Sequence, residues 1–333
     1  MHQLAFPMLV ALVAMALAFD FLNGLHDAAN SIATVVSTQL LSPMVAVAFA
    51  AVGNFLAYWI VGLHVAETVG SGIIDKDVVT PAVVFGALGG AMSWNVLTWL
   101  KGLPSSSSHA LIGGLLGAGI AHSGFSAVES AGTSKTMIAI VLSPMIGFAI
   151  AMLLMLLTSM LFQRTPPVRA NRTFKGLHLV SSAAQSISHG GNDAQKTMGV
   201  IAVLLYSTGH LGGKFHVPGW VVLSCYAAMS LGTLSGGWRI IRTMGTRLTR
   251  LNHHSGFCAS SASSIVLFGA SALGVPVSTT HAITGSVVGT GAARRSSAVR
   301  WSVAARVVVA WFVTIPASGA VAALFYLLTK LFT

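Results

Sequence analysis

Two polar motifs, each centred on an aspartate, interrupt long apolar runs of this 333-residue sequence. The first is Asn-Gly-Leu-His-Asp-Ala-Ala-Asn at residues 23–30, and the second is Ser-His-Gly-Gly-Asn-Asp-Ala-Gln-Lys at residues 188–196. A carboxylate at membrane depth is costly unless it faces a partner, an ion or water. Carboxylate and amide oxygens suit a small cation, and they also suit a proton relay. We therefore expect a site for a coupling ion or proton at Asn23, His26, Asp27, Asn30, Asn192 and Asp193.

Basic side chains within the two motifs could change which cation the motifs accept. Lys196 stands where the first motif has Asn30, and its ammonium could replace a bound cation, pair with Asp193 as a structural ion pair, or lie beside an anion. His26 and His189 flank the aspartates and could carry protons near neutral pH, although packing or hydrogen bonding is the more common role of a membrane histidine. The motifs do not indicate which metal, if any, would bind.

A second pair of motifs places hydroxyl side chains one or two positions after a proline. These motifs are Gly-Leu-Pro-Ser-Ser-Ser-Ser-His at residues 102–109 and Gly-Val-Pro-Val-Ser-Thr-Thr-His at residues 274–281. Such a pattern is typical of a capped helix start, which offers unpaired N–H groups and the positive end of the helix dipole. Two such starts that meet would bind a tetrahedral anion; alternatively, the hydroxyls merely cap their helices. The predicted substrate-binding residues are Ser105, Ser106, Ser107, Ser108, Ser278, Thr279, Thr280, Gln195 and Lys196, with His109, His281 and His189 in supporting roles.

Both motif pairs recur in the same order at nearly the same offset, which indicates a duplicated membrane unit. Asp27 and Asp193 are 166 residues apart, and His109 and His281 are 172 residues apart. The predicted parts of the chain are a first membrane repeat at 1–162, a basic cytoplasmic linker at 163–175, and a second, inverted repeat at 176–333.

The composition excludes a water-soluble domain and indicates membrane-spanning helices. The chain has 18 basic and 7 acidic residues, and its mean hydropathy is +0.80. The net charge of +11 does not indicate nucleic-acid binding, because most basic residues gather in three loops, as the positive-inside rule predicts for a multi-pass protein. We expect a protein of the inner (plasma) membrane whose partner is the lipid bilayer and not nucleic acid. The three loops contain Arg164, Arg169, Arg172 and Lys175; Arg239, Arg242, Arg247 and Arg250; and Arg294, Arg295 and Arg300.

The apolar stretches predict an all-α membrane protein with broken helices. Residues 4–40 would form a helix of roughly 55 Å, against a bilayer core of about 30 Å, so we expect this helix to break near Asn23-Gly24. Pro43 should open the next helix, at 44–62. If both proline-hydroxyl motifs turn back at mid-membrane as re-entrant helical hairpins, each half crosses three times and the halves have inverted topology. If each hairpin arm crosses fully, each half crosses five times, and the charge distribution permits both arrangements.

The motifs resemble those of the inorganic phosphate transporter (PiT) family over nearly the whole chain. The resemblance rests on Asn-Gly-Leu-His-Asp-Ala-Ala-Asn-Ser-Ile-Ala-Thr, Ser-His-Gly-Gly-Asn-Asp-Ala-Gln-Lys and Pro-Val-Ser-Thr-Thr-His. It implies an inverted-repeat carrier of orthophosphate that is driven by sodium or protons and is often a homodimer. Sodium-coupled members resemble Gly-Ala-Asn-Asp-Val-Ala-Asn and Gly-Ala-Asn-Asp-Val-Gly-Asn, in which asparagine stands at the places of His26 and Lys196. Both replacements resemble the bacterial low-affinity branch, which is proton-coupled and takes phosphate with a divalent metal.

We therefore expect a proton-coupled symporter of inorganic phosphate, which could take phosphate as a divalent metal complex. The alternatives are sodium-coupled phosphate symport and transport of another tetrahedral oxyanion such as sulfate. An intramembrane hydrolase that pairs Ser108 with His109, or Ser278 with His281, is disfavoured because catalytic pairs normally join distant segments. We expect no enzyme activity and no cofactor, and the lack of a Walker motif in the sequence argues against ATP drive within this chain.

Overall fold

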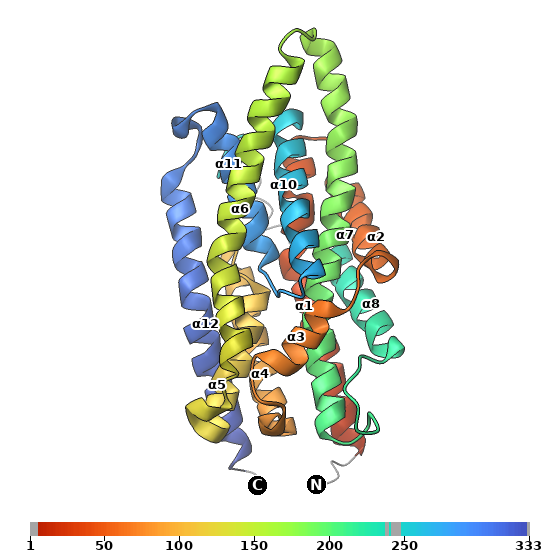
Figure 1. Ribbon diagram of the computed structural model, residues 1–333, viewed down its shortest axis with the longest axis vertical. Coiled ribbons are helices and arrows are strands. Elements are labelled where there is room, and N and C mark those ends of the chain that lie inside the picture. The colour runs from red at the N-terminus through yellow and green to blue at the C-terminus, as the bar shows by residue number, and fades with distance from the viewer. Residues whose placement is uncertain (1–5, 237–239, 241–247, 332–333) are drawn as a thin grey trace.

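The computed structural model describes residues 6–236, 240 and 248–331, which form an elongated bundle of helices (Figure 1). No β-strand occurs within these ranges, and seven of their helices are long and apolar enough to cross a membrane. The prediction of an all-α membrane protein is therefore confirmed. The helices are α1 (Phe6–Ser37), α2 (Pro43–Ile60), α3 (His64–Gly72), η1 (Lys76–Val78), α4 (Pro81–Lys101), α5 (Ser107–Ser123), η2 (Gly124–Ala127), α6 (Ser130–Phe162), α7 (Pro167–Ser207), α8 (Gly219–Ser235), α10 (His253–Ala272), α11 (Thr279–Arg294), η4 (Ser296–Ala298) and α12 (Trp301–Thr329).

Two helical hairpins point at each other from opposite ends of the bundle. The α4–α5 hairpin occupies the lower part of Figure 1 and the α10–α11 hairpin the upper part, and their connections, at 102–106 and 273–278, meet in the interior. The Thr280 hydroxyl donates a 3.2 Å hydrogen bond to the carbonyl oxygen of Ser105, which joins the two tips. This arrangement agrees with the predicted hairpins. The inverted relation of the halves stays a prediction, and so does the number of full crossings, since α4 and α10 are themselves candidate spans.

Each hairpin packs its second helix against a long helix from the other half of the chain. Helix α5 lies against α12, where a Cβ atom on Gly117 would come within 2.1 Å of the carbonyl oxygen of Gly319. Helix α11 lies against α6, where a Cβ atom on Gly285 would come within 2.2 Å of the carbonyl oxygen of Pro144. Small residues allow membrane helices to approach this closely. The two halves are therefore interleaved, and each tip is held by both of them.

The predicted break near Asn23-Gly24 is wrong, because α1 is one continuous helix through the first aspartate motif. Gly24 allows a close helix contact and not a break: a Cβ atom there would lie 2.0 Å from the carbonyl oxygen of Met229 in α8. Gly232 of α8 reciprocates, since its Cβ atom would lie 2.0 Å from the carbonyl oxygen of Phe21. Helix α7 is likewise unbroken through the second motif. Both aspartate motifs therefore lie on continuous helices and not at helix ends.

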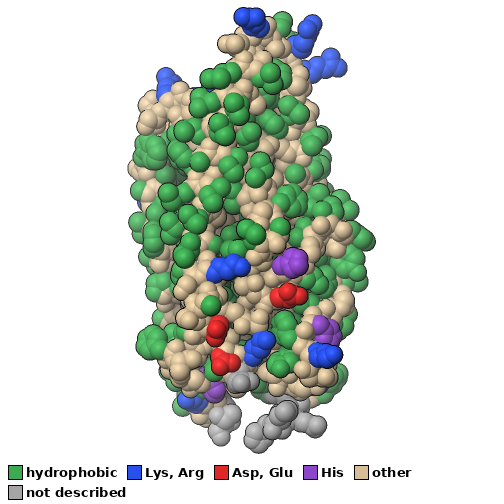
Figure 2. Space-filling model, viewed as in Figure 1, with side chains coloured by type: hydrophobic (Ala, Val, Ile, Leu, Met, Phe, Trp, Pro, Cys, Tyr) green, Lys and Arg blue, Asp and Glu red, His purple; other side chains and the backbone are tan. Residues whose placement is uncertain are grey.

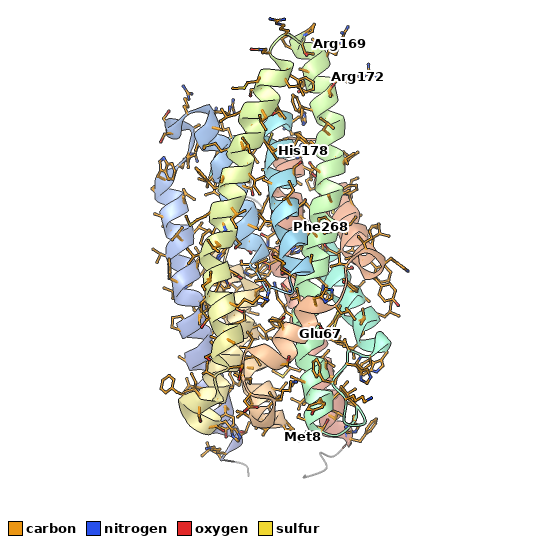
Figure 3. All side chains as sticks on the ribbon, viewed as in Figure 1. Met8, Glu67, Arg169, Arg172, His178 and Phe268 are labelled. Atoms are coloured by element: carbon orange, nitrogen blue, oxygen red, sulfur yellow. The ribbon has the colours of Figure 1, made fainter. Side chains whose placement is uncertain are left out.

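The described basic loops lie at one end of the bundle, opposite both termini. Arg169 and Arg172 lie at the upper end of Figure 3, whereas Glu67 and Met8 lie in its lower half. Figure 2 shows the acidic atoms of this face in the lower half as well. The described basic loops thus share one end, as the positive-inside prediction requires. Arg239, Arg242 and Arg247 of the second basic loop lie outside the described residues.

The connection between the two halves is shorter than predicted. Helix α7 already begins at Pro167, so only residues 163–166 separate it from α6. The rest of the linker predicted at 163–175 is helical, because proline is favoured in the first turn of a helix and sets its start here. The repeats at 1–162 and 176–333 stay predictions.

Candidate functional site

The first aspartate motif reaches both hairpin tips from α1. The Ser107 hydroxyl at the start of α5 lies 2.6 Å from Asp27 Oδ2 and 2.6 Å from Asn23 Oδ1. Asn30 donates a 2.9 Å hydrogen bond to the Thr280 hydroxyl at the start of α11. The three α1 residues recur at spacings of three and four and therefore lie on one face of the helix. All five side chains are buried, so this face forms the centre of the molecule and not part of its surface.

A chain of hydrogen bonds leads from Asp27 to the tip of the first hairpin. His26 Nδ1 lies 2.8 Å from Asp27 Oδ1, and His26 Nε2 lies 3.1 Å from the Thr98 hydroxyl of α4. Ser105 donates a 3.0 Å hydrogen bond to the same Thr98 hydroxyl. A carboxylate, an imidazole and two hydroxyls in succession can hold and pass a proton. Sequence reasoning missed Thr98, because a single threonine in an apolar helix carries no signal of its own.

Lys196 of α7, the last residue of the second motif, contacts Asp193 and both hairpin tips. Its ammonium donates hydrogen bonds to Asp193 Oδ1, to the Ser108 hydroxyl at 2.5 Å and to the Val277 carbonyl oxygen at 2.7 Å. Thr279 donates a further hydrogen bond of 2.9 Å to Asp193 Oδ2. Lys196 is only 2% exposed, so all three ammonium donors are satisfied inside the protein. The ion pair therefore joins α7 to the tips of both hairpins.

The second helix of each hairpin begins with a matched cap. Ser106 Oγ accepts a 3.2 Å hydrogen bond from the backbone N–H of His109, and Ser278 Oγ accepts one of 3.2 Å from the N–H of His281. These caps leave the earlier N–H groups of both first turns available to an anion. The rings of the two histidines contact each other with their centroids 4.3 Å apart, and His281 stacks on Trp311 at 3.7 Å. The histidines thus support the tips through backbone and ring contacts.

Asp27, Asp193 and Lys196 form a buried cluster with the hydroxyls of the two hairpin tips. Two predicted residues of the second motif turn away from this cluster. Gln195 Oε1 accepts hydrogen bonds of 3.0 and 3.2 Å from the backbone N–H groups of Val65 and Ala66, and so caps the start of α3. Asn192 Nδ2 donates a 3.1 Å hydrogen bond to the Ser271 hydroxyl of α10. The structure therefore does not bring Gln195 to the other predicted substrate residues, nor Asn192 to the other predicted coupling residues.

The helical period of α7 explains which residues enter the cluster. Asp193 and Lys196, three residues apart, share one face of the helix. His189 lies one turn before Asp193 on that face, with its Nδ1 3.3 Å from Asp193 Oδ2. Asn192 and Gln195 each precede a cluster residue by one position, which turns them by about 100°. This difference in direction follows from an unbroken helix, whereas position in the motif alone does not distinguish these two residues from Asp193 and Lys196.

The cluster is closed off inside the protein. The seven hydroxyl residues at 105–108 and 278–280 are each at most 3% exposed. Across the described ranges, no group of three or more His, Cys, Asp or Glu side chains is placed to hold a metal ion. Hydroxyls, helix starts and one ammonium offer donors to a tetrahedral anion, while His26 and Asp27 can hold a proton. An anion that enters must replace hydrogen bonds which the hydroxyls now donate to the two aspartates.

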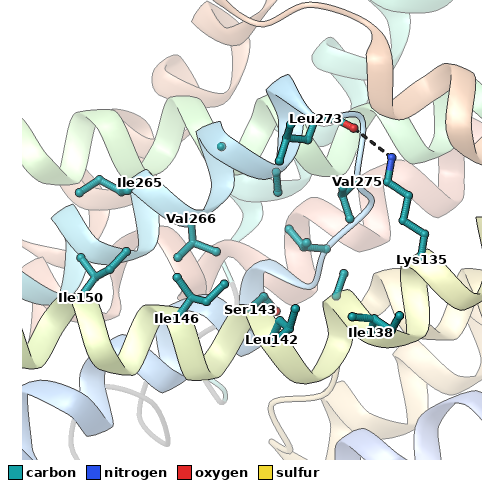
Figure 4. Close-up of a pocket in the computed structure, with 14 residues that line it drawn as sticks. Lys135, Ile138, Leu142, Ser143, Ile146, Ile150, Ile265, Val266, Leu273 and Val275 are labelled. Carbon is teal, nitrogen blue, oxygen red and sulfur yellow. Dashed lines mark hydrogen bonds between the residues drawn. The ribbon is translucent and has the colours of Figure 1, made fainter.

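An apolar groove, here named the tip groove, lies behind the second hairpin tip between α6 and α10 (Figure 4). Its volume is about 410 Å³, and Lys135 at one end donates a 3.1 Å hydrogen bond to the carbonyl oxygen of Leu273. Val277 separates the tip groove from the cluster. It lines the groove, while its carbonyl oxygen accepts a hydrogen bond from Lys196 on the cluster side. Apart from Lys135 and Ser143, the side chains that line the groove are apolar, which does not suit an oxyanion, so we do not assign the substrate to it.

Buried carboxylates and an ammonium beneath two opposed, hydroxyl-bearing hairpin tips are typical of a membrane transport protein. The chain belongs to the phosphate transporter family, whose model matches residues 23–173 and 162–322. The family expected from the motifs is therefore confirmed.

Similar proteins cover nearly the whole chain. It is 60% identical to the "Probable low-affinity inorganic phosphate transporter" of Rhizobium meliloti (strain 1021), over 97% of both chains. It is 40% identical to the protein of the same description from Bacillus subtilis (strain 168), again over 97% of both. A solved structure described as "The sodium-dependent phosphate transporter" has a TM-score of 0.89 at 24% identity, covering 98% of this chain and 100% of that one. At this identity, the similarity establishes the shared fold alone.

Proposed function

We propose that the protein is a secondary active symporter that carries inorganic phosphate across the inner (plasma) membrane together with protons. Membership of the phosphate transporter family and the descriptions of relatives at 60% and 40% identity support phosphate as the substrate. Seven candidate spans support a multi-pass membrane protein. The protein acts as a carrier and not as an enzyme, and it needs no cofactor.

Phosphate binds between the two hairpin tips in this proposal. The serines at 105–108 and the residues at 278–280 contribute hydroxyls, the starts of α5 and α11 contribute N–H groups, and Lys196 contributes a buried positive charge. Ser107 and Thr279 at present donate to the two motif carboxylates. When these hydroxyls turn to phosphate, each buried carboxylate loses a donor, and taking up a proton then avoids an uncompensated charge. Phosphate binding and proton binding would therefore favour each other.

The position of Lys196 is the single observation that favours protons over sodium. Its ammonium contacts a carboxylate oxygen, a hydroxyl and a carbonyl oxygen, which are the hard oxygen ligands that a sodium ion would use. A second cation 4 Å from the ammonium would be repelled by about 4 kcal/mol at an effective dielectric of about 20. The chain thus carries its own cation at the second motif. The His26–Asp27 pair and its hydrogen bond to Thr98 then supply the proton site at the first motif.

Three further features belong to the same proposal. The recurrence of both motifs, together with two hairpins that point at each other from opposite ends of the bundle, supports two related, inverted repeats. A divalent metal that arrives with phosphate would enter as part of the substrate, since no group of three or more His, Cys, Asp or Glu side chains among the described residues is placed to hold a metal ion. The many exposed apolar side chains suit contact with the lipid bilayer and with a second copy in a homodimer.

Uptake of radiolabelled phosphate into proteoliposomes tests the proposal. We expect a pH gradient, alkaline inside, to drive uptake in sodium-free buffer, and a sodium gradient at equal pH to drive none. His26→Asn should abolish the response to the pH gradient. His210→Asn, which changes an exposed histidine just after the end of α7, should retain it. Measuring phosphate uptake after removal of Mg²⁺ tests whether phosphate enters as a metal complex. Measuring it with excess sulfate tests whether sulfate competes as a substrate. Uptake that requires sodium and ignores the pH gradient would overturn proton coupling.

A further inference from the structure

Four arginines surround a cavity at the end of the bundle that carries the α6–α7 connection. The cavity has a volume of about 590 Å³ and lies where the residues before α10, the end of α11 and the start of α12 come together. Two hydrogen bonds fix its wall: Arg300 N–H donates to the carbonyl oxygen of Leu248 at 2.9 Å, and the Thr249 hydroxyl donates to that of Ala298 at 3.0 Å. The described lining residues are Thr249, Arg250, Arg294, Arg295, Ser297, Ala298 and Arg300.

No acidic residue is among the described residues that line this cavity. The whole sequence has 7 acidic residues. Asp20, Asp27 and Asp193 are buried among the helices, and the other four, at positions 67, 75, 77 and 129, lie in or beside α3, η1 and the start of α6, in the lower half of the bundle (Figure 1). Within the two aspartate motifs, Asp27 pairs with His26, and Asp193 pairs with His189 and Lys196. Four guanidinium groups around one space repel one another, so an anion from outside would lower the energy of this arrangement.

We propose that this arginine cavity binds a phosphate group at the base of the second hairpin. The planar guanidinium group donates two parallel hydrogen bonds to phosphate oxygens, and several such groups around a cavity form a specific anion site. Two sources share this chemistry: the headgroup of an anionic phospholipid, and free inorganic phosphate on the side of the basic loops. Because the cavity joins the start of α10 and the end of α11 to α12, the bound group holds the hairpin base in place. Phosphate there regulates the hairpin without entering the transport site.

The positive-inside rule explains basic residues at this end but not their convergence on a cavity. Arg164 and Arg172 satisfy the same rule from the α6–α7 connection and the first turns of α7, where they are exposed and line none of the described cavities. They therefore provide a matched control. Loss of charge is identical in the pairs Arg164→Gln/Arg172→Gln and Arg250→Gln/Arg295→Gln, and only the second pair changes the cavity.

The experiment measures thermal unfolding of the full-length protein and both variants in phosphatidylcholine nanodiscs. One arm replaces part of the lipid by phosphatidylglycerol, and the other titrates inorganic phosphate at constant ionic strength. The transport site is intact in every protein, so any difference between the variants reports the cavity and does not depend on the proposed coupling. Should the glutamine pair not fold, Arg250→Lys/Arg295→Lys keeps the charge and removes the planar fork, and the same comparison applies.

We expect one of the two phosphate sources to raise the Tm of the wild type and of the control variant, Arg164→Gln/Arg172→Gln. The cavity variant, Arg250→Gln/Arg295→Gln, should need about tenfold more of that source for the same rise in Tm. A selective loss of the phosphatidylglycerol response identifies a lipid headgroup, and a selective loss of the inorganic phosphate response identifies the free anion. Equal responses of the cavity and control variants in both arms, including no response at all, overturn the inference.

Discussion

Replacing Lys196 by asparagine tests whether an ammonium stands in the place of a coupling ion. The substitution removes the donor to Asp193 Oδ1 and leaves the Ser108 hydroxyl and the Val277 carbonyl oxygen without their shared partner. Asp193 keeps Thr279 as a donor on its other oxygen. Removing one partner of a buried ion pair costs about 3–5 kcal/mol, because the remaining charge is not compensated. We expect the Tm of Lys196→Asn in sodium-free buffer to fall by at least about 5 °C.

The same substitution should create a sodium site. The oxygens of Asp193, Ser108 and Val277 that the ammonium contacts would face a cation together with the new amide oxygen. If sodium binds there with a Kd of about 1 mM, 100 mM sodium stabilises the variant by about 2.7 kcal/mol. Sodium should therefore restore about half or more of the lost stability, and phosphate uptake by the variant should become sodium-dependent.

Differential scanning fluorimetry in sodium chloride and in choline chloride of equal ionic strength measures both effects. Lys101→Asn is the control, since Lys101 is exposed at the end of α4 and should leave both the Tm and the sodium response unchanged. The reasoning would be refuted if sodium raised the Tm of the wild type as much as that of Lys196→Asn. It would also be refuted if Lys196→Asn were as stable as the wild type in choline chloride.

Three further predictions concern the hydroxyls, the helix contact and an unused aspartate. Ser107→Ala/Thr279→Ala should weaken phosphate uptake at least about tenfold with unchanged circular dichroism, because each loses a buried hydroxyl donor; wild-type uptake contradicts this. Gly24→Leu should prevent folding, measured by gel filtration, while Gly176→Leu, which meets no atom within 4 Å, should not. Asp20 is fully buried and its oxygens make no hydrogen bond among the described residues, so Asp20→Asn should keep or raise the Tm; a lower Tm would reveal a charged partner.

The hairpin tips could be predicted from sequence because their signals are local. A proline, a hydroxyl and small residues suffice to start and cap a helix, and the structure has Ser106 and Ser278 as caps at the two predicted starts. The recurrence of the motifs also predicted that the two starts would meet, and the hydrogen bond from the Thr280 hydroxyl to the Ser105 carbonyl oxygen joins them. The hydrogen bonds of Ser107 to Asp27 and of Thr279 to Asp193 were not predicted.

The continuity of α1 and α7 could not be predicted, because it depends on contacts far apart in sequence. Glycine weakens an isolated helix by about 1 kcal/mol, which favours a break when only the local sequence is considered. In the structure, Gly24 packs against the backbone at Met229, and a larger side chain would prevent that contact. The orientation of Gln195 towards α3 follows from the same continuity, since only an intact helix fixes which side of α7 it occupies.

Several hydrogen bonds between motifs and tips cross from one half of the chain to the other. Asn30 of the first motif donates to Thr279 and Thr280 of the second hairpin, and Lys196 of the second motif donates to Ser108 of the first hairpin. A ligand between the tips therefore changes the hydrogen bonds of both aspartate helices at once. A tip that moves must also move against its neighbours, and the tip groove of about 410 Å³ behind the second tip provides apolar space on that side. Crossed contacts of this kind make separate occupation of the two motifs costly, which suits a carrier that moves its ions and its substrate together.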